Sequence, residues 1–156
     1  MTLSLDDFIV EESKMSSVEI KAKIGSIFLT DFDDKDQGFV LKEGETSRQK
    51  FFIVIGNDSS GNAIGVIFIN TKPNPKVNFN KDFLDTQYFI LQRDYSKFLK
   101  YDSYVDCSKI RELCNDRIHR FKFKGNILPD DLERIMDMLK TSETIRVKEK
   151  KRFGLI

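Results

Sequence analysis

The sequence lacks the residues and segments on which several functional classes depend. It has no tryptophan, one histidine and two cysteines in 156 residues, and the spacing of Cys107, Cys114 and His119 matches no zinc-binding pattern. It has no glycine-rich phosphate loop of the Walker or Rossmann type. We therefore predict no metal site and no cofactor, and we interpret both cysteines as reduced thiols in core or strand positions.

Long hydrophobic runs are also missing. No stretch approaches the roughly 20 apolar residues that a membrane-spanning helix needs. The acidic N-terminus has no basic start followed by an apolar run, so we expect no signal peptide. These absences predict a cytoplasmic protein with no membrane partner.

The net charge is only +1, so a global electrostatic attraction to nucleic acid is not expected. The charge is nevertheless uneven, because residues 1–20 are acidic and the tail after Lys140 is basic. One interpretation is that the acidic and basic ends attract one another, and another is that the basic tail contacts phosphate. A solvated or mutually paired charged surface is the simpler interpretation.

Apolar residues make up 40% of the chain, and 14 residues are phenylalanine, which favours strands and packed cores. Short apolar runs predict strands at residues 24–29, 51–55, 64–69, 87–91 and 104–110. The run at 51–55 is continuous, which indicates burial on both faces, and residues 57–62 have the composition of a hairpin turn. Residues 1–22 form a short extension with helical character, and residues 23–156 form one domain.

Residues 129–140 give the clearest helix signal. Leu132, Ile135 and Leu139 recur at helical spacing, Pro129 suits the first turn, and two aspartates follow it at the positive end of the helix dipole. Strands in hairpin order followed by one helix predict a mainly β (α+β) protein built as a small closed or half-closed barrel.

Three segments, in this order, resemble the MazF/PemK toxin family. The first is Ile-Gly-Ser-Ile-Phe-Leu-Thr-Asp-Phe-Asp at 24–33. The second is Arg-Gln-Lys-Phe-Phe-Ile-Val-Ile-Gly-Asn-Asp at 48–58, with Gly-Val-Ile-Phe-Ile-Asn-Thr at 65–71. The third is Asp-Ser-Tyr-Val-Asp-Cys-Ser-Lys-Ile-Arg at 102–111, with Gly-Asn-Ile-Leu-Pro-Asp-Asp-Leu at 125–132.

The resemblance implies an SH3-like barrel of about five to seven antiparallel strands with a C-terminal helix, usually as a homodimer. It also implies a toxin–antitoxin protein, a metal-independent endoribonuclease that cleaves single-stranded RNA and is neutralised by a small antitoxin protein.

The resemblance also implies where the site lies. The family's Arg-Pro pair falls on Lys50-Phe51 in one register and on Gln49-Lys50 in another, and Arg48 lies one or two places earlier. We therefore take Lys50 or Arg48 as the cation for the scissile phosphate and Thr71 as its hydrogen-bond donor. Such a reaction uses the adjacent 2′-hydroxyl as nucleophile and needs proton transfer and charge stabilisation.

Further substrate-binding candidates flank these positions: Glu45, Ser47, Lys72, His119 and Arg120. Glu45 fits the family's loop acids loosely. His119 and Arg120 lie in the run 117–124, where basic and aromatic residues interleave as in sites that combine base stacking with phosphate contacts. His119 is also a natural acid–base group, although the resemblance gives it no role.

Ordinary structural interpretations compete at each position. Lys50 could be a solvent-facing residue at the start of a strand, Arg48 an ordinary loop charge, and Thr71 the end of a strand. Two further functions therefore stay open. One is a catalytically inactive barrel that binds a protein partner or nucleic acid, and the other is a structural or regulatory protein that docks through its charged ends.

Overall fold

The computed structural model describes residues 23–33, 41–71, 85–114 and 119–156. Within these ranges the chain forms seven strands: β1 (Ser26–Phe32), β2 (Arg48–Asn57), β3 (Ala63–Asn70), β4 (Gln87–Ile90), β5 (Ser103–Asp106), β6 (Arg111–Cys114) and β7 (Lys122–Asn126). The helices are the 3₁₀ turn η1 (Gln92–Tyr95), α3 (Pro129–Thr141) and α4 (Val147–Arg152). The predicted extension at residues 1–22 lies outside the described residues.

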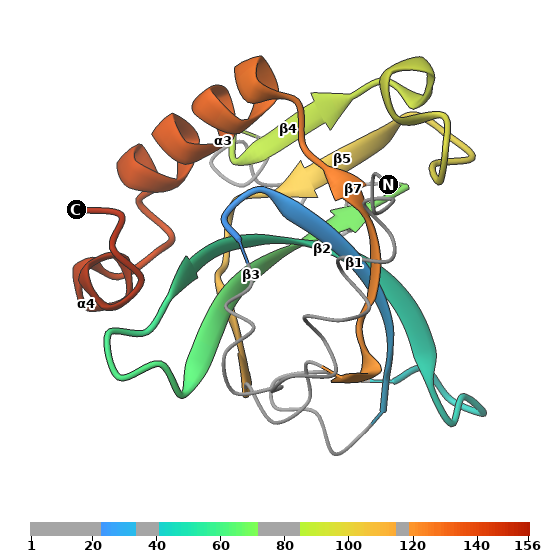
Figure 1. Cartoon of the computed structure of the whole chain (residues 1–156), viewed down its shortest axis with the longest axis horizontal. Helices are drawn as coiled ribbons and strands as arrows, with labels where there is room; N and C mark the ends of the chain where they lie inside the picture. Colours follow the sequence, from blue (N-terminus) through green and yellow to red (C-terminus); the bar gives the residue numbers. More distant parts are fainter. Residues whose placement is uncertain (1–22, 34–40, 72–84, 115–118) are drawn as a thin grey trace, which may run out of the picture.

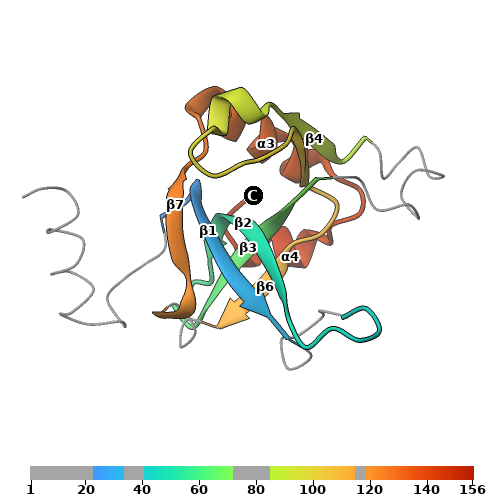
Figure 2. The ribbon, with the colours of Figure 1, turned by 90° about the vertical axis from the view of Figure 1, so that its right-hand side faces the viewer.

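All the strand pairs are antiparallel and belong to one sheet in the order β4-β5-β3-β2-β1-β7. β6 lies off this path and pairs with the first half of β3, whereas β5 pairs with its last two residues. The sheet is strongly curved (Figures 1 and 2). The prediction of a mainly β, barrel-like α+β fold with a C-terminal helix is confirmed.

The central strand β2 is buried on both faces, as its continuous apolar run predicts. Ile53 and Ile55 belong to the larger core cluster, together with residues of α3 and the C-terminal segment. Phe52 and Val54 belong to a second cluster, which is rich in phenylalanine. Side chains alternate along a strand, so a continuous apolar run is what two cores on opposite faces require.

Helix α3 covers one end of the sheet and crosses near β4 (Figure 1). Its residues Ile135 and Leu139 are fully buried. Asp131 in its first turn accepts hydrogen bonds from the hydroxyls of Tyr88 and Tyr95, each 2.6 Å from a carboxylate oxygen. These bonds fasten the start of α3 to β4 and η1.

The basic tail forms the helix α4, on which Lys148, Lys151 and Arg152 are exposed. Lys150 is buried and donates to the carbonyl oxygens of Lys140 and Ser142, at 2.7 and 2.8 Å. Arg152 pairs with Asp58 at 3.0 Å and with Glu112 at 2.5 Å. Arg152 of the tail therefore pairs with carboxylates of the β2–β3 turn and of β6, while the acidic segment 1–20 lies in residues that are not described.

No helix in the described ranges has the length and apolar character needed to cross a membrane.

Candidate functional site

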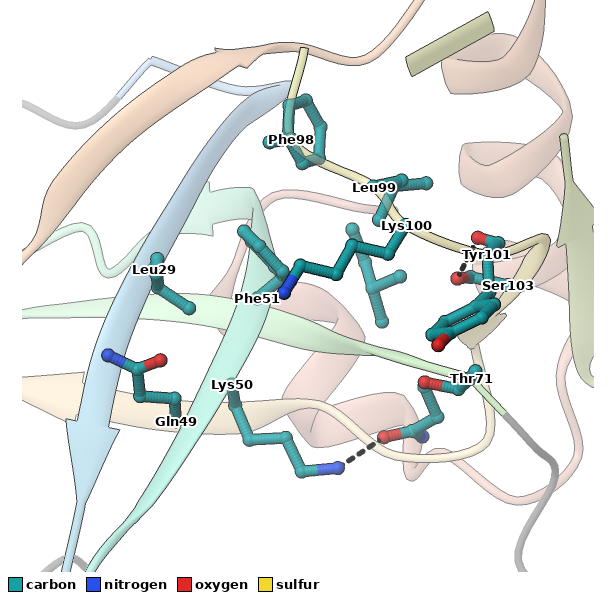
Figure 3. A pocket seen from close by; sticks show the side chains of 12 residues that line it. Leu29, Gln49, Lys50, Phe51, Thr71, Phe98, Leu99, Lys100, Tyr101 and Ser103 are labelled. Atoms are coloured by element: carbon teal, nitrogen blue, oxygen red, sulfur yellow. Dashed lines mark hydrogen bonds between the residues drawn. The ribbon is translucent and has the colours of Figure 1, made fainter. Parts of the chain in front are cut away.

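A pocket of about 410 Å³ opens beside the end of β3 and the start of β2, and the segment that follows η1 borders it on the other side (Figure 3). Its lining combines apolar, amide, hydroxyl and ammonium groups: Leu29, Gln49, Lys50, Phe51, Ile69, Asn70, Thr71, Phe98, Leu99, Lys100, Tyr101 and Ser103. The pocket thus contains two of the three predicted catalytic residues.

Lys50 is the best-defined cation of this site. Its Nζ donates to Asn70 Oδ1 at 2.7 Å and lies 5.8 Å from the centroid of the Phe68 ring. Burial lowers the pKa of the Lys50 ammonium, and the nearby positive charges of Arg48, Arg111 and Lys42 lower it further, while Asp106 opposes them. A half-buried ammonium in positive surroundings favours an approaching anion.

Thr71 is exposed and directly follows the last residue of β3. Asn70, which accepts the hydrogen bond from Lys50, immediately precedes Thr71 in the chain. Lys50 and Thr71 line the same pocket, and their roles in it remain predictions.

Arg48 is differently placed. Its guanidinium forms an ion pair with Glu45 at 2.5 Å, and it does not line the pocket. The hydrogen bond from Arg48, with a second from the Lys42 backbone, lowers the pKa of Glu45 to about 2. Arg48 and Glu45, which the sequence suggested for separate tasks, are therefore partners of each other. Ser47, just before Arg48, is exposed.

His119 and Arg120 are exposed and lie in a short turn that precedes β7. Arg120 donates to the Asp31 carbonyl oxygen at 3.0 Å, and Thr30 Oγ1 lies 3.5 Å from the Arg120 carbonyl oxygen. Neither His119 nor Arg120 lines the pocket, and Lys72 lies outside the described residues.

Several residues near the site were not among the sequence-based candidates. Asn70 holds the Lys50 ammonium, and its position at the polar end of an apolar strand was a signal that could have revealed it. Arg111 reaches the same region because β6 pairs with β3, and its guanidinium carbon lies 4.4 Å from the centroid of the Phe68 ring. Burial lowers the pKa of Arg111.

Among the described residues that line the pocket there is no carboxylate and no imidazole. Over the described part of the chain, no group of three or more histidine, cysteine, aspartate or glutamate side chains is arranged to hold a metal ion. Cys107 is buried and Cys114 exposed, and both are free thiols.

The sequence matches no family model and no curated protein. The fold is similar to that of a chain in the crystal structure of MazE–MazF from Deinococcus radiodurans, with a TM-score of 0.50 and 11% identity. The match covers 76% of this chain and 92% of that chain. At this identity the likeness shows the fold, and the fold is MazF-like.

Proposed function

We propose that the protein is a toxin-like, metal-independent endoribonuclease that binds and cleaves single-stranded RNA at the Lys50–Thr71 pocket. The observation that carries the proposal is the half-buried Lys50 ammonium, held at 2.7 Å by Asn70 beside Thr71 in a pocket of about 410 Å³. The MazF-like fold supports it.

The chemistry assigned to the site is attack of a ribose 2′-hydroxyl on the adjacent phosphorus. The 2′-hydroxyl gives up its proton to solvent water, the bond to the 5′-oxygen of the next nucleotide breaks, and a 2′,3′-cyclic phosphate forms. The departing 5′-oxygen takes a proton from water and becomes a hydroxyl. Lys50 neutralises the charge that develops on the non-bridging oxygens, and the Thr71 hydroxyl donates a hydrogen bond to one of them. RNA fits this chemistry because DNA lacks the attacking hydroxyl.

One observation favours a second function, a binding module without catalysis. The part of the lining that the structure describes offers no carboxylate or imidazole to take the proton from the 2′-hydroxyl, and that transfer is part of the reaction. On this alternative the same cation holds an RNA phosphate or a charged group of a protein partner, and no bond is broken.

The experiment is incubation of the purified protein with a long single-stranded RNA in excess chelator. A variant carrying Lys50→Ala and Thr71→Ala is the test, and Lys23→Ala, an exposed lysine outside the pocket, is the matched control. We expect site-selective cutting that the double variant loses and the control keeps. No cutting by folded protein would favour the binding module, and cutting that survives the double substitution would refute the site.

Two partner proposals follow from the MazE–MazF likeness. One is a small antitoxin protein, and cell growth on induced expression tests the toxin part: arrest supports it, and unchanged growth speaks against it. The other is a homodimer, which elution at the monomer mass across a tenfold dilution series would reject.

A further inference from the structure

Four residues lie in a row across four strands on one face of the sheet. Lys50 on β2 bonds to Asn70 on β3. Asn70 is paired with Tyr104 on β5, and Tyr104 is paired with Phe89 on β4. Directly opposed residues of antiparallel strands point to the same side of the sheet. The row thus leads from the ammonium to two aromatic rings.

The rings of Phe89 and Tyr104 contact one another, with centroids 5.2 Å apart and planes inclined at 54°. Phe89 is 47% exposed, and neither ring belongs to the two core clusters. Its neighbours Tyr88 and Ile90 point the other way and pack with the larger core. At an exposed position of an edge strand a polar residue is the ordinary choice, and packing in the two described core clusters does not account for Phe89.

The spacing between this aromatic pair and Lys50 suits a neighbouring nucleotide. Adjacent strands lie about 4.8 Å apart, so the backbone of Tyr104 is about 10 Å from that of Lys50 and the backbone of Phe89 about 14 Å. A single strand whose phosphate contacts Lys50 can therefore place a flanking base over the rings.

The charges on this face also favour an anionic strand. Lys50 and Arg111 both lie over the Phe68 ring, beside the row. Asp106 lies two residues after Tyr104 on β5, therefore on the same face, and would repel phosphate. One oxygen of its carboxylate, Oδ1, already accepts hydrogen bonds from Gln87 Nε2 at 2.8 Å and from the hydroxyl and backbone nitrogen of Ser108.

We propose that Phe89 and Tyr104 form a base-stacking subsite of the RNA site, one that takes an unpaired base flanking the phosphate at Lys50. The inference rests on the proposed function of the Lys50–Thr71 pocket and adds to it a preference for unpaired bases. Every base has a stacking face, so such a subsite selects unpaired RNA with little regard to sequence, and a duplex cannot offer its bases to it.

The absence of tryptophan from the chain provides a direct test. Phe89→Trp introduces a single fluorophore at the subsite, and Phe123→Trp places one at a matched aromatic position, 48% exposed, on β7. The ligand is a short single-stranded RNA with 2′-O-methyl groups, which cannot be cleaved by 2′-oxygen attack. We expect this RNA to quench the tryptophan of Phe89→Trp and to leave that of Phe123→Trp unchanged.

Binding is measured in parallel by the anisotropy of a labelled copy of the same RNA. Phe89→Ala is expected to weaken binding about tenfold, within the range of base–aromatic stacking. Phe89→Trp should retain the affinity, and Phe123→Ala should not change it. Thermal unfolding confirms that each variant is folded.

The outcomes separate the two proposals. If Lys50→Met weakens RNA binding but Phe89→Ala does not, and the tryptophan is not quenched, the stacking subsite is wrong and the Lys50 site stands. If the wild-type protein binds no RNA, the proposed function is wrong and the subsite falls with it. If Phe89→Ala alters only the mass on elution, the face is a contact between copies of this chain and the subsite is overturned.

Discussion

The packing of Phe153 against two glycines of the sheet gives a prediction that can be worked through in detail. Phe153 is buried just after α4. A Cβ added at Gly65 on β3 would lie 2.9 Å from two atoms of the Phe153 ring and 3.2 Å from Ile110 Cγ2. One added at Gly56 on β2 would lie 2.2 Å from the Phe153 carbonyl oxygen. Gly65 therefore leaves room for the ring of Phe153, and Gly56 leaves room for its backbone.

The difference predicts a specific non-additivity. Overpacking usually costs about 1–3 kcal/mol, which we expect for Gly65→Ala alone, and Phe153→Ala should cost about 3–5 kcal/mol. Removing the ring removes most of the obstacle at Gly65. The double variant Gly65→Ala, Phe153→Ala should therefore be about as stable as Phe153→Ala alone, which corresponds to a coupling energy of about 1–3 kcal/mol between the two substitutions. Gly56→Ala should remain destabilising in the Phe153→Ala background because its obstacle is a backbone oxygen.

Urea unfolding of the four proteins in each cycle, followed by far-UV circular dichroism, gives the free energies. The Gly56 cycle is the matched control, since it differs only in the part of Phe153 that the new methyl group meets. Simple additivity at Gly65, or equal coupling in both cycles, would refute the reasoning that the aromatic ring fills the space above Gly65.

Three further predictions concern the tyrosine pair and the site. Asp131→Ala should cost about 1–3 kcal/mol in urea unfolding because Tyr88 and Tyr95 lose their common acceptor, and Asp131→Asn, which keeps one oxygen, should cost less. Burial and the Asp131 carboxylate raise the pKa of Tyr95. The Tyr95 hydroxyl therefore contributes fully to the free energy of unfolding below the unfolded tyrosine pKa of about 10, and this contribution is lost as the pH rises above it. Tyr95→Phe should flatten the fall in stability measured above about pH 10. Lys50→Met keeps the apolar stem and removes a desolvated charge, so thermal unfolding should show an unchanged or higher midpoint while RNA cleavage is lost, and a large drop in the midpoint would contradict this.

The elements with strong local signals could be predicted from the sequence. The run Phe51–Ile55 has no polar residue, so only a strand between two cores accommodates it, and the two clusters show those cores. Pro129 and the apolar stripe that follows it predicted α3, which spans Pro129–Thr141. Propensity and periodicity are local properties, and they are reliable where a segment's neighbours reinforce them.

The remaining features depend on contacts between distant segments. Helix α4 is highly charged and carries no apolar stripe, and Phe153, which anchors it, lies just beyond its end. The sequence gives no sign that Arg111 reaches the Lys50 region, because only the pairing of β6 with the first half of β3 brings it there. The ion pair between Arg48 and Glu45 is local, but the sequence alone could not decide between that pair and two separate contacts with substrate.

The strand register helps to decide what a lysine can do at the position where the family resemblance implies an arginine. Lys50 and Arg48 are two residues apart on β2 and so share a face, whereas Gln49 points to the other side. Arg48 is paired with Glu45 and lies outside the pocket, so of these two cations Lys50 is the one that lines it, together with Asn70 and Thr71. Lys100 is a second cation in the lining. A lysine is a point charge without the fork of an arginine, so it can neutralise a phosphate but cannot fix its orientation. On the proposed function, the Thr71 hydroxyl of the same pocket and a base held on Phe89 and Tyr104 would supply the orientation that the missing guanidinium cannot.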